Sequence, residues 1–188
     1  MEIKKKAENL RIVYREQLNP RHFLIGLRPE GKLPLMLPGQ FVQARVEHSP
    51  STFLRRPFSI HSVDYHSNTF RLLIQIKGEG TRHLAALKEG DLLNLIYPLG
   101  NSFSIPNCHE VLLVGGGCGV APLLFLAQFL NQHEIRPAIL LGFRSREEIA
   151  ETEEYARYGQ VLITTEDGSE GEKGMVTYHS VKIGRAHV

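Results

Sequence analysis

A change of pattern near residue 106 constrains the fold of this chain more than any other feature. Before it, short apolar stretches alternate with turn residues, which is typical of an antiparallel barrel or sandwich. After it, the apolar run Val111–Val114 leads into a glycine-rich turn and an apolar helical stretch. Strand, turn, helix and strand in this order are the units of a parallel sheet. We therefore expect an antiparallel β-domain at 1–106 and a parallel α/β domain at 107–182.

The expected elements follow from apolar periodicity and turn residues. In the first domain we predict strands at 9–15, 22–28, 40–47, 69–77 and 91–96, and a helix at 81–87. In the second we predict strands at 111–114, 137–141 and 160–165, helices at 121–133 and 147–158, and the start of another helix at 174–178. This makes a three-stranded, partial parallel sheet. Residues 183–188 resemble the translation of a sequencing adapter, so we expect a non-native tail on a truncated chain.

Composition excludes several classes of protein. The apolar content of 42% and charged content of 22% are those of a globular chain, and the net charge of +2 does not favour nucleic acid. No apolar run is long enough for a membrane span, and no apolar signal core follows the first lysines, so we expect a cytoplasmic protein. The two cysteines, Cys108 and Cys118, cannot alone form a four-cysteine metal site.

The stretch Phe53–Ile60 carries the first candidate site. Pro57 fits an edge strand, a strand start or a bulge, because it lacks a backbone donor. Arg56 offers a guanidinium fork for a phosphate, Phe58 an apolar wall and Ser59 a short hydroxyl. Such residues suit a phosphorylated, planar, polar-edged ring. A surface strand with two solvated arginines would show the same residues.

The second candidate is the glycine loop between the expected strand and helix. Its glycines, Gly115, Gly117 and Gly119 among them, would let backbone N–H groups approach a pyrophosphate at the helix start. Pro122 stands near the place of the last glycine in the usual dinucleotide motif, and the usual acidic residue further on is absent. A purely structural turn would also explain the glycines. Cys118 is either a reactive thiol or a packing residue.

Three more segments are site candidates by their positions. Gly80 and Thr81 open the short helix and could hold a phosphate, although Thr81 could be only an N-cap. The arginines of 142–146 could contact a 2′-phosphate or lie in a solvated loop. The loop with Asp167 and Gly168 follows the third parallel strand, where ligands collect in open sheets, although turn chemistry would also account for it.

Together, four motifs in this order resemble the ferredoxin-reductase-like flavoprotein family. They are Arg56-Pro57-Phe58-Ser59, Gly78-Glu79-Gly80-Thr81, Pro98-Leu99-Gly100-Asn101-Ser102-Phe103, and the glycine loop ending at Ala121-Pro122. Within that family, Leu54–Ile60, Pro38–Phe41, Gly117–Pro122 and Thr165–Ser169 are most similar to the electron-transfer subunits of class B dihydroorotate dehydrogenase. The resemblance covers about residues 8–180.

The resemblance implies an FAD-binding barrel followed by a partial NAD-binding domain. It places the FAD phosphates at Arg56, Gly80 and Thr81, and the flavin ring near Phe58 and Ser59, with Ser59 as the catalytic residue near flavin N5. The remaining implied cofactor contacts are Pro57 and the backbone of Leu73, Ile74 and Gln75 for FAD, and Gly115, Gly117, Gly119, Pro122, Asp167 and Gly168 for the nicotinamide cofactor.

In such proteins electrons pass between NAD(H) and FAD, then through a [2Fe-2S] cluster to the FMN-containing catalytic subunit of dihydroorotate dehydrogenase, in a heterotetramer of pyrimidine biosynthesis. This chain departs from the pattern because it has no cysteine cluster near its end. Phe58 and Tyr97 also replace the tyrosine and glycine of many relatives. Two alternatives remain open: a reductase subunit of another assembly, such as an electron-bifurcating ferredoxin:NADP reductase or an anaerobic sulfite reductase, and a non-catalytic nucleotide-binding module.

Overall fold

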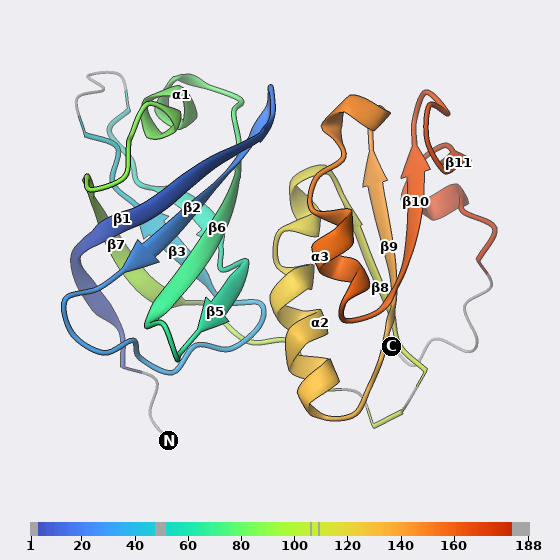
Figure 1. Ribbon diagram of the computed structural model, residues 1–188, viewed down its shortest axis with the longest axis horizontal. Helices are drawn as coiled ribbons and strands as arrows, with labels where there is room; N and C mark the ends of the chain where they lie inside the picture. Colours follow the sequence, from blue (N-terminus) through green and yellow to red (C-terminus); the bar gives the residue numbers. More distant parts are fainter. Residues whose placement is uncertain (1–3, 48–51, 106, 109, 182–188) are drawn as a thin grey trace.

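The computed structural model describes residues 4–47, 52–105, 107–108 and 110–181. They form two sheets that lie side by side, with two helices between them (Figure 1). The first sheet is antiparallel and has seven strands, and the second is parallel and has four. The predicted fold class, an antiparallel barrel followed by a parallel α/β unit, is therefore confirmed. The predicted tail at 183–188 lies outside the described residues.

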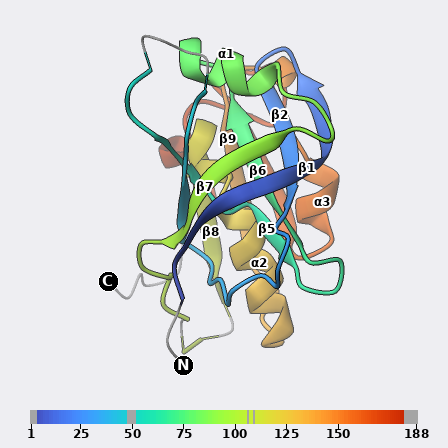
Figure 2. The same cartoon turned by 90° about the vertical axis from the view of Figure 1, so that its left-hand side faces the viewer.

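The first sheet curls into a barrel. Its strands are β1 (Lys6–Asn19), β2 (His22–Arg28), β3 (Phe41–Ala44), β4 (Arg56–Ser59), β5 (Ser62–Asp64), β6 (Thr69–Gln75) and β7 (Leu92–Leu99), in the spatial order β4-β3-β7-β1-β2-β6-β5. The two outer strands, β4 and β5, are consecutive in the chain. Ile60 donates its N–H to Gln40 O beside β3, and His61 donates to Arg71 O on β6. Two residues thus join the two edges of the sheet. Figure 2 shows strands β7, β1, β2 and β6 of the barrel side by side.

The barrel core explains why these strands form. Apolar side chains that alternate along β1, β2, β6 and β7 point inward and are fully buried, as a period of two requires. Tyr97 belongs to this core. Its ring stacks on Phe70 at a centroid distance of 5.3 Å, and its hydroxyl donates to Glu8 Oε1 at 2.8 Å. Helix α1 (Glu79–Ala85) lies at one end of the barrel.

The parallel sheet has the order β11-β10-β9-β8. Its strands are β8 (Leu112–Gly116), β9 (Ala138–Phe143), β10 (Gln160–Thr165) and β11 (Glu172–Lys173). Helices α2 (Leu123–Gln132) and α3 (Thr152–Ala156) lie on the side of this sheet that faces the barrel (Figure 1). The described residues contain no helix long and apolar enough to cross a membrane.

Several sequence predictions need correction. The parallel sheet has four strands rather than three, because the two-residue strand β11 pairs with the end of β10. The helix predicted at 147–158 is broken into a 3₁₀ turn (Arg146–Glu148) and the short α3. The break lies at Ile149, which is extended, and Glu151, which is left-handed at φ 54°. Val176–Tyr178 forms a 3₁₀ turn rather than the start of an α-helix. Strand β5 was not predicted.

The cores of the two halves interlock. Phe125 of α2 packs into the barrel core, while Leu24 of β2 and Leu73 of β6 pack into the core under the parallel sheet. Polar contacts reinforce the interface: Arg21 pairs with Glu148 at 3.2 Å, and Asn19 donates to Glu148 O at 3.2 Å. The barrel and the α/β half are therefore held in one arrangement, which positions the sites described next.

Candidate functional site

The two adjacent arginines at the start of β4 have different surroundings. Arg55 Nη1 donates to the carbonyls of Gln43 and Asn94 at 3.1 and 3.2 Å, so its guanidinium ties β4 to β3 and β7. Arg56 is half-buried and makes no hydrogen bond or ion pair with any residue the structure describes. Arg56 is therefore the arginine that remains available to an anionic ligand.

The start of α1 lies against Arg56. A Cβ added to Gly80 would come within 3.4 Å of Arg56 Nε and 3.2 Å of Thr52 Cγ2. The structure thus brings together two residues predicted to contact phosphate, although they are 24 positions apart. Thr81 is not the N-cap, because Gly78 takes that position. Its hydroxyl accepts the N–H groups of Lys77 and Gly78 at 2.9 and 3.0 Å and shapes the turn before the helix.

An open backbone edge lies between β6 and β4. Strand β5 pairs with β6 only over Thr69–Arg71, whereas β2 pairs with β6 as far as Gln75. Along a strand, the backbone groups of successive residues point alternately to its two edges. Arg71 of β6 directs its carbonyl away from β2, toward the N–H of His61, so the other odd-numbered residues of β6 also direct their backbone groups away from β2. Leu73 and Gln75 therefore present backbone groups to the gap beside β4. A polar-edged ring with a phosphate tail fits this gap.

Strand β4 lies beside the same gap. Pro57 is exposed, and Phe58 is partly buried against the barrel core. Ser59 is half-buried and its backbone pairs with Phe41. The strand is an edge strand, as Pro57 predicted. The residues present, a free arginine, a close glycine and an open strand edge, thus fit an FAD molecule.

Different physical requirements explain the glycines of the loop after β8. A Cβ on Gly115 would approach Gly119 O to 2.8 Å and Leu123 Cδ1 to 2.7 Å, so only glycine fits. Gly117 has a left-handed φ of +55°. A Cβ added to Gly119 would meet no atom within 4 Å, so packing does not explain why this position is a glycine. Pro122 is the N-cap of α2, which begins two residues later than predicted.

A pocket of about 340 Å³ joins the two halves at the carboxyl ends of β8, β9 and β10. The barrel contributes Gln75 to it, and the glycine loop contributes Gly116, Gly117 and Cys118. Sequence analysis did not select Thr164, which also lines the pocket. Its hydroxyl is buried and has no hydrogen-bond partner among the described residues. Its place on the third parallel strand was the one sequence signal that could have indicated it.

The loops around this pocket divide between ligand-facing and structural residues. Arg144 and Glu166 line the pocket, whereas Arg146 is held by Glu170 Oε2 at 2.6 and 2.9 Å. Asp167 and Gly168 do not line it. Asp167 accepts the hydroxyl and the N–H of Ser169 at 2.6 and 2.9 Å, and these hydrogen bonds lower the pKa of its carboxyl group.

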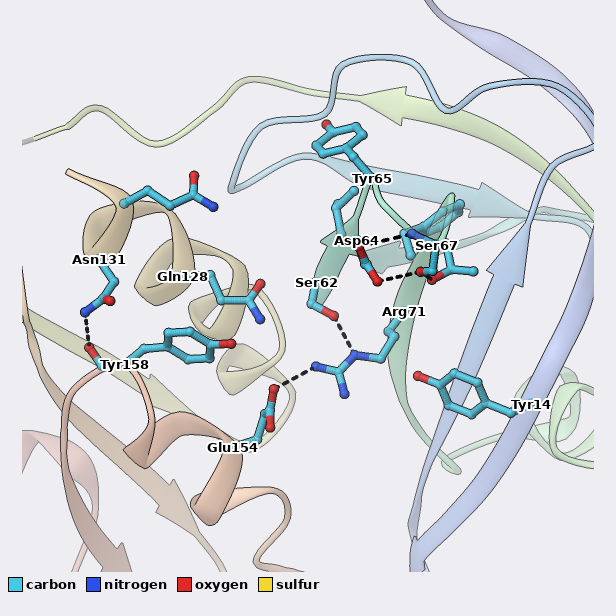
Figure 3. A pocket seen from close by; sticks show the side chains of 14 residues that line it. Tyr14, Ser62, Asp64, Tyr65, Ser67, Arg71, Gln128, Asn131, Glu154 and Tyr158 are labelled. Carbon is cyan, nitrogen blue, oxygen red and sulfur yellow. Dashed lines mark hydrogen bonds and ion pairs between the residues drawn. The ribbon is translucent and has the colours of Figure 1, made fainter. Parts of the chain in front are cut away.

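A larger pocket, of about 730 Å³, lies between β5 and β6 on one side and α2 and α3 on the other (Figure 3). Its polar side chains largely bond to one another: Arg71 Nε donates to Ser62 Oγ, and Asp64 Oδ2 accepts the hydroxyl of Ser67 at 2.6 Å. None of the residues predicted to bind a cofactor lines this pocket. Size alone therefore does not identify the cofactor site.

An iron–sulfur cluster does not fit the residues described. Cys108 and Cys118 are both exposed, and no three His, Cys, Asp or Glu side chains in the described ranges are grouped as metal ligands would be. A [2Fe-2S] cluster needs four such ligands.

Comparisons with known proteins agree with this geometry. Residues 11–103 match the family model of the oxidoreductase FAD-binding domain. The chain is 38% identical over 175 residues to the "Dihydroorotate dehydrogenase B (NAD(+)), electron transfer subunit" of Streptococcus pneumoniae strain R6, covering 92% of this chain and 68% of that protein. The protein of the same name from Caldanaerobacter subterraneus is 43% identical over 148 residues, covering 79% of this chain and 56% of that protein.

Solved structures show the same fold. The NADH-dependent reduced ferredoxin-NADP oxidoreductase, described in a study of flavin-based electron bifurcation, superposes with a TM-score of 0.76 at 30% identity, covering 89% of this chain and 60% of that one. The flavohem-like FAD/NAD-binding domain of a Vibrio cholerae nitric oxide dioxygenase gives a TM-score of 0.81 at 18% identity, covering 93% and 81%. The predicted class, a flavin-dependent NAD(P)H oxidoreductase subunit, is thereby confirmed. The chain belongs to the family of the electron transfer subunits of dihydroorotate dehydrogenase B (NAD(+)).

Proposed function

We propose that this protein binds FAD and passes electrons between NAD(H) and the catalytic, FMN-containing subunit of a dihydroorotate dehydrogenase in pyrimidine biosynthesis. One observation carries the proposal: Gln75, at the end of the open strand β6, shares a pocket with Gly116–Cys118 of the glycine loop. A flavin against β6 and a nicotinamide at the glycine loop would therefore meet. When bound, the flavin supplies the exchange between two-electron and one-electron chemistry.

The chain's own residues would hold FAD as follows. Arg56 and the backbone at Gly80, which lie against each other, would bind the phosphates. Thr81 would support this site through the turn that its hydroxyl holds in place. Leu73 and Gln75 would bind the ring through the open edge of β6, whereas the backbone groups of Ile74 face β2 and are not available to it. Pro57 and Phe58 would flank the ring from β4, and the Ser59 hydroxyl would donate a hydrogen bond near flavin N5. In this proposal Ser59 is the catalytic residue.

The nicotinamide cofactor would occupy the pocket at the carboxyl edge of the parallel sheet. Gly115, Gly117 and Gly119 let the backbone approach its pyrophosphate at the start of α2, where Pro122 sets the first turn. The loop at Asp167 and Gly168 borders the site through its neighbour Glu166. Arg144 and Glu166 both line this pocket, so its charges do not decide between the two nicotinamide cofactors. We propose NAD(H) rather than NADP(H) because the relatives' name specifies NAD(+).

The wider assignment rests on the relatives. We propose an FAD-binding domain at 1–106, a partial NAD-binding domain at 107–182, a cytoplasmic location and a heterotetramer with the catalytic subunit. The chain spans about two thirds or less of the length of the two curated relatives compared above. A [2Fe-2S] cluster has no ligand set among the described residues. No step through a cluster is assigned to them.

The test of the FAD site is reconstitution with FAD followed by measurement of its affinity. Arg56→Ala should weaken FAD binding by about 1–3 kcal/mol, because a charged hydrogen bond is lost. Arg45→Ala, which removes an exposed arginine just beyond β3, is the matched control and should bind FAD as the unaltered protein does. Equal affinity in Arg56→Ala and the control would remove Arg56 from the site. A protein without flavin absorbance after reconstitution would refute the proposal.

A second candidate function has one observation in its favour. The electron-bifurcation oxidoreductase is 30% identical to this chain, so a reductase subunit of such an assembly is the alternative. The two assignments differ in the partner protein. Reduction of the FAD-loaded protein by NADH, followed by mixing with a dihydroorotate-oxidising subunit or with a ferredoxin, separates them, because only the correct partner should reoxidise the flavin quickly.

A further inference from the structure

His61 lies completely buried between the barrel and the α/β half. It follows β4 by two residues, and its backbone N–H donates to Arg71 O. Among the described residues, the nitrogens of its ring bond to the other half of the molecule: Nδ1 lies 2.6 Å from Ala121 O, and Nε2 lies 2.5 Å from Glu151 Oε2. One side chain of the barrel thus joins the end of the glycine loop to the residue before α3.

Both partners of the ring are acceptors, which fixes the hydrogens of this cluster. The Ala121 carbonyl can only accept, so Nδ1 carries a hydrogen. The second contact needs one more hydrogen between Nε2 and Glu151 Oε2. The cluster therefore holds a proton between the two halves, and Arg71 Nη1 at 3.3 Å from Glu151 Oε1 adds a cation.

Two further features show that the arrangement is tightly determined. The Tyr155 hydroxyl donates to Val120 O at 2.7 Å, so His61 and Tyr155 hold the carbonyls of two successive residues of the loop. Glu151 adopts a left-handed φ of 54°, which a non-glycine residue adopts at a cost in energy. This backbone conformation breaks the predicted helix and accompanies the contact of Glu151 with His61 and Arg71. Arg71 also reaches Glu154 at 3.5 Å (Figure 3).

We propose that His61 is a positioning residue for hydride transfer: through Ala121 O and Glu151 it fixes the glycine loop relative to β4, and so the nicotinamide relative to the flavin. This inference rests on the proposed function. His61 lies two positions after Ser59, and Arg71 lies two positions before Leu73, so the cluster is tied to both strands proposed to hold the flavin ring. On the other side it is tied to the loop proposed to hold the nicotinamide cofactor.

Two substitutions separate the two hydrogen bonds of the ring. Asparagine places an amide N–H near the position of Nδ1, so His61→Asn can keep the bond to Ala121 O and lose the one to Glu151. The glutamine amide reaches the position of Nε2, so His61→Gln can keep the hydrogen bond to Glu151 and leave Ala121 O without its donor. His133→Gln is the matched control, because His133 is exposed and its Nδ1 bonds only to Phe129 O of its own helix.

The measurement is rapid-mixing reduction of the FAD-loaded protein by NADH, which gives the rate of reduction and the Kd of NADH separately. His61→Gln should slow reduction by about 10- to 100-fold, since misplaced reactants lose rate steeply. Its Kd for NADH should change by less than about threefold, because the pocket residues remain. His61→Asn should keep more of the rate than His61→Gln. Reduction of His61→Gln at the rate of the His133→Gln control would overturn the inference.

Hydrogen exchange in the flavin-free protein provides a second, independent measurement. Amides of 117–123 should exchange faster in His61→Gln than in the unaltered protein and should stay protected in His61→Asn. Equal exchange in all three proteins would overturn the inference even if the variants fail to retain FAD. If the unaltered protein itself binds no FAD or is not reduced by NADH, the proposed function fails, and the exchange measurement still decides whether His61 holds the loop.

Discussion

The barrel and the parallel sheet bury their apolar residues in different ways. In the barrel, the sheet closes on itself and residues such as Phe70 and Ile74 are completely buried. In the parallel sheet, helices cover one face, where Leu113 and Ile139 are buried, while Val114 on the other face remains 43% exposed. The barrel therefore holds its core by its own strands, whereas the parallel sheet depends on the helices and on the barrel beside it. The half that closes on itself would hold the flavin, and the half with the partly open face would receive the nucleotide.

The test with the largest expected effect truncates a side chain in the barrel core. Phe70→Ala should lower the free energy of unfolding by about 3–5 kcal/mol, because it leaves a cavity beside Tyr97. Denaturant unfolding followed by circular dichroism measures this change. A loss of less than about 1 kcal/mol would mean that the barrel core collapses around the cavity, so that the barrel would not hold its core by close packing of its own strands.

Substitutions in the glycine loop after β8 test the α/β half where the nicotinamide cofactor is proposed to bind. Gly115→Ala should cost about 1–3 kcal/mol, because the added methyl group would overlap Leu123 and Gly119 O. Gly119→Ala meets no neighbouring atom, so it should change the free energy of unfolding by less than about 0.5 kcal/mol. It should nevertheless weaken NADH binding, since the methyl group would point into space proposed for the cofactor. Unchanged NADH affinity in Gly119→Ala would place the pyrophosphate elsewhere.

The stability that the interface between the two halves contributes should decrease at acid pH. Burial raises the pKa of the Glu151 carboxyl group, but the hydrogen bond and charge of His61 and the charge of Arg71 outweigh it, so the folded pKa lies below the ordinary 4.5. Stability from Glu151 is then fully present above pH 4.5 and lost as the pH falls through the folded pKa. Glu151→Gln should flatten this part of the stability profile. Identical acid profiles for both proteins would show that the cluster does not tie the halves together.

The smallest effect is expected on the open face of the parallel sheet. Val114→Thr should change the free energy of unfolding by less than about 0.5 kcal/mol, because the side chain is already largely in water. The same denaturant measurement applies. A loss above 1 kcal/mol would show that something covers this face in solution and would remove the contrast with the barrel.

Sequence alone predicted the two sheets because their apolar periods differ. The bounds of β2 and β10 agree with the prediction to the residue, and both strands have neighbours on each side in their sheets. The helix predicted at 147–158 was wrong, since the tertiary contacts of Glu151 accompany a left-handed backbone that no local preference favours. Strand β5 was missed because its three residues form a strand only by pairing with β6.

The candidate site was predicted in part. The adjacency of Arg56 and Gly80 was expected only through the resemblance, and the structure brings them together. Sequence analysis chose Arg56 rather than Arg55 as the phosphate ligand, but the physical difference is seen only in the structure, where the carbonyls of Gln43 and Asn94 come within reach of the Arg55 guanidinium. The His61–Glu151 contact was beyond sequence reasoning, since it depends on segments far apart in the chain, and Thr164 had only its place on the third parallel strand to indicate it.

Closure of the barrel through residues 60–61 has a consequence for chain connectivity. The two outer strands of the sheet are held together there by a peptide link as well as by hydrogen bonds to Gln40 and Arg71. A circular permutant with new ends at this point would lose that link at the strand proposed to hold the flavin. New ends in the exposed turn at 65–66, beyond β5, would leave the link intact. The positions at which this barrel tolerates new chain ends are thus set by the place where its two outer strands, β4 and β5, meet.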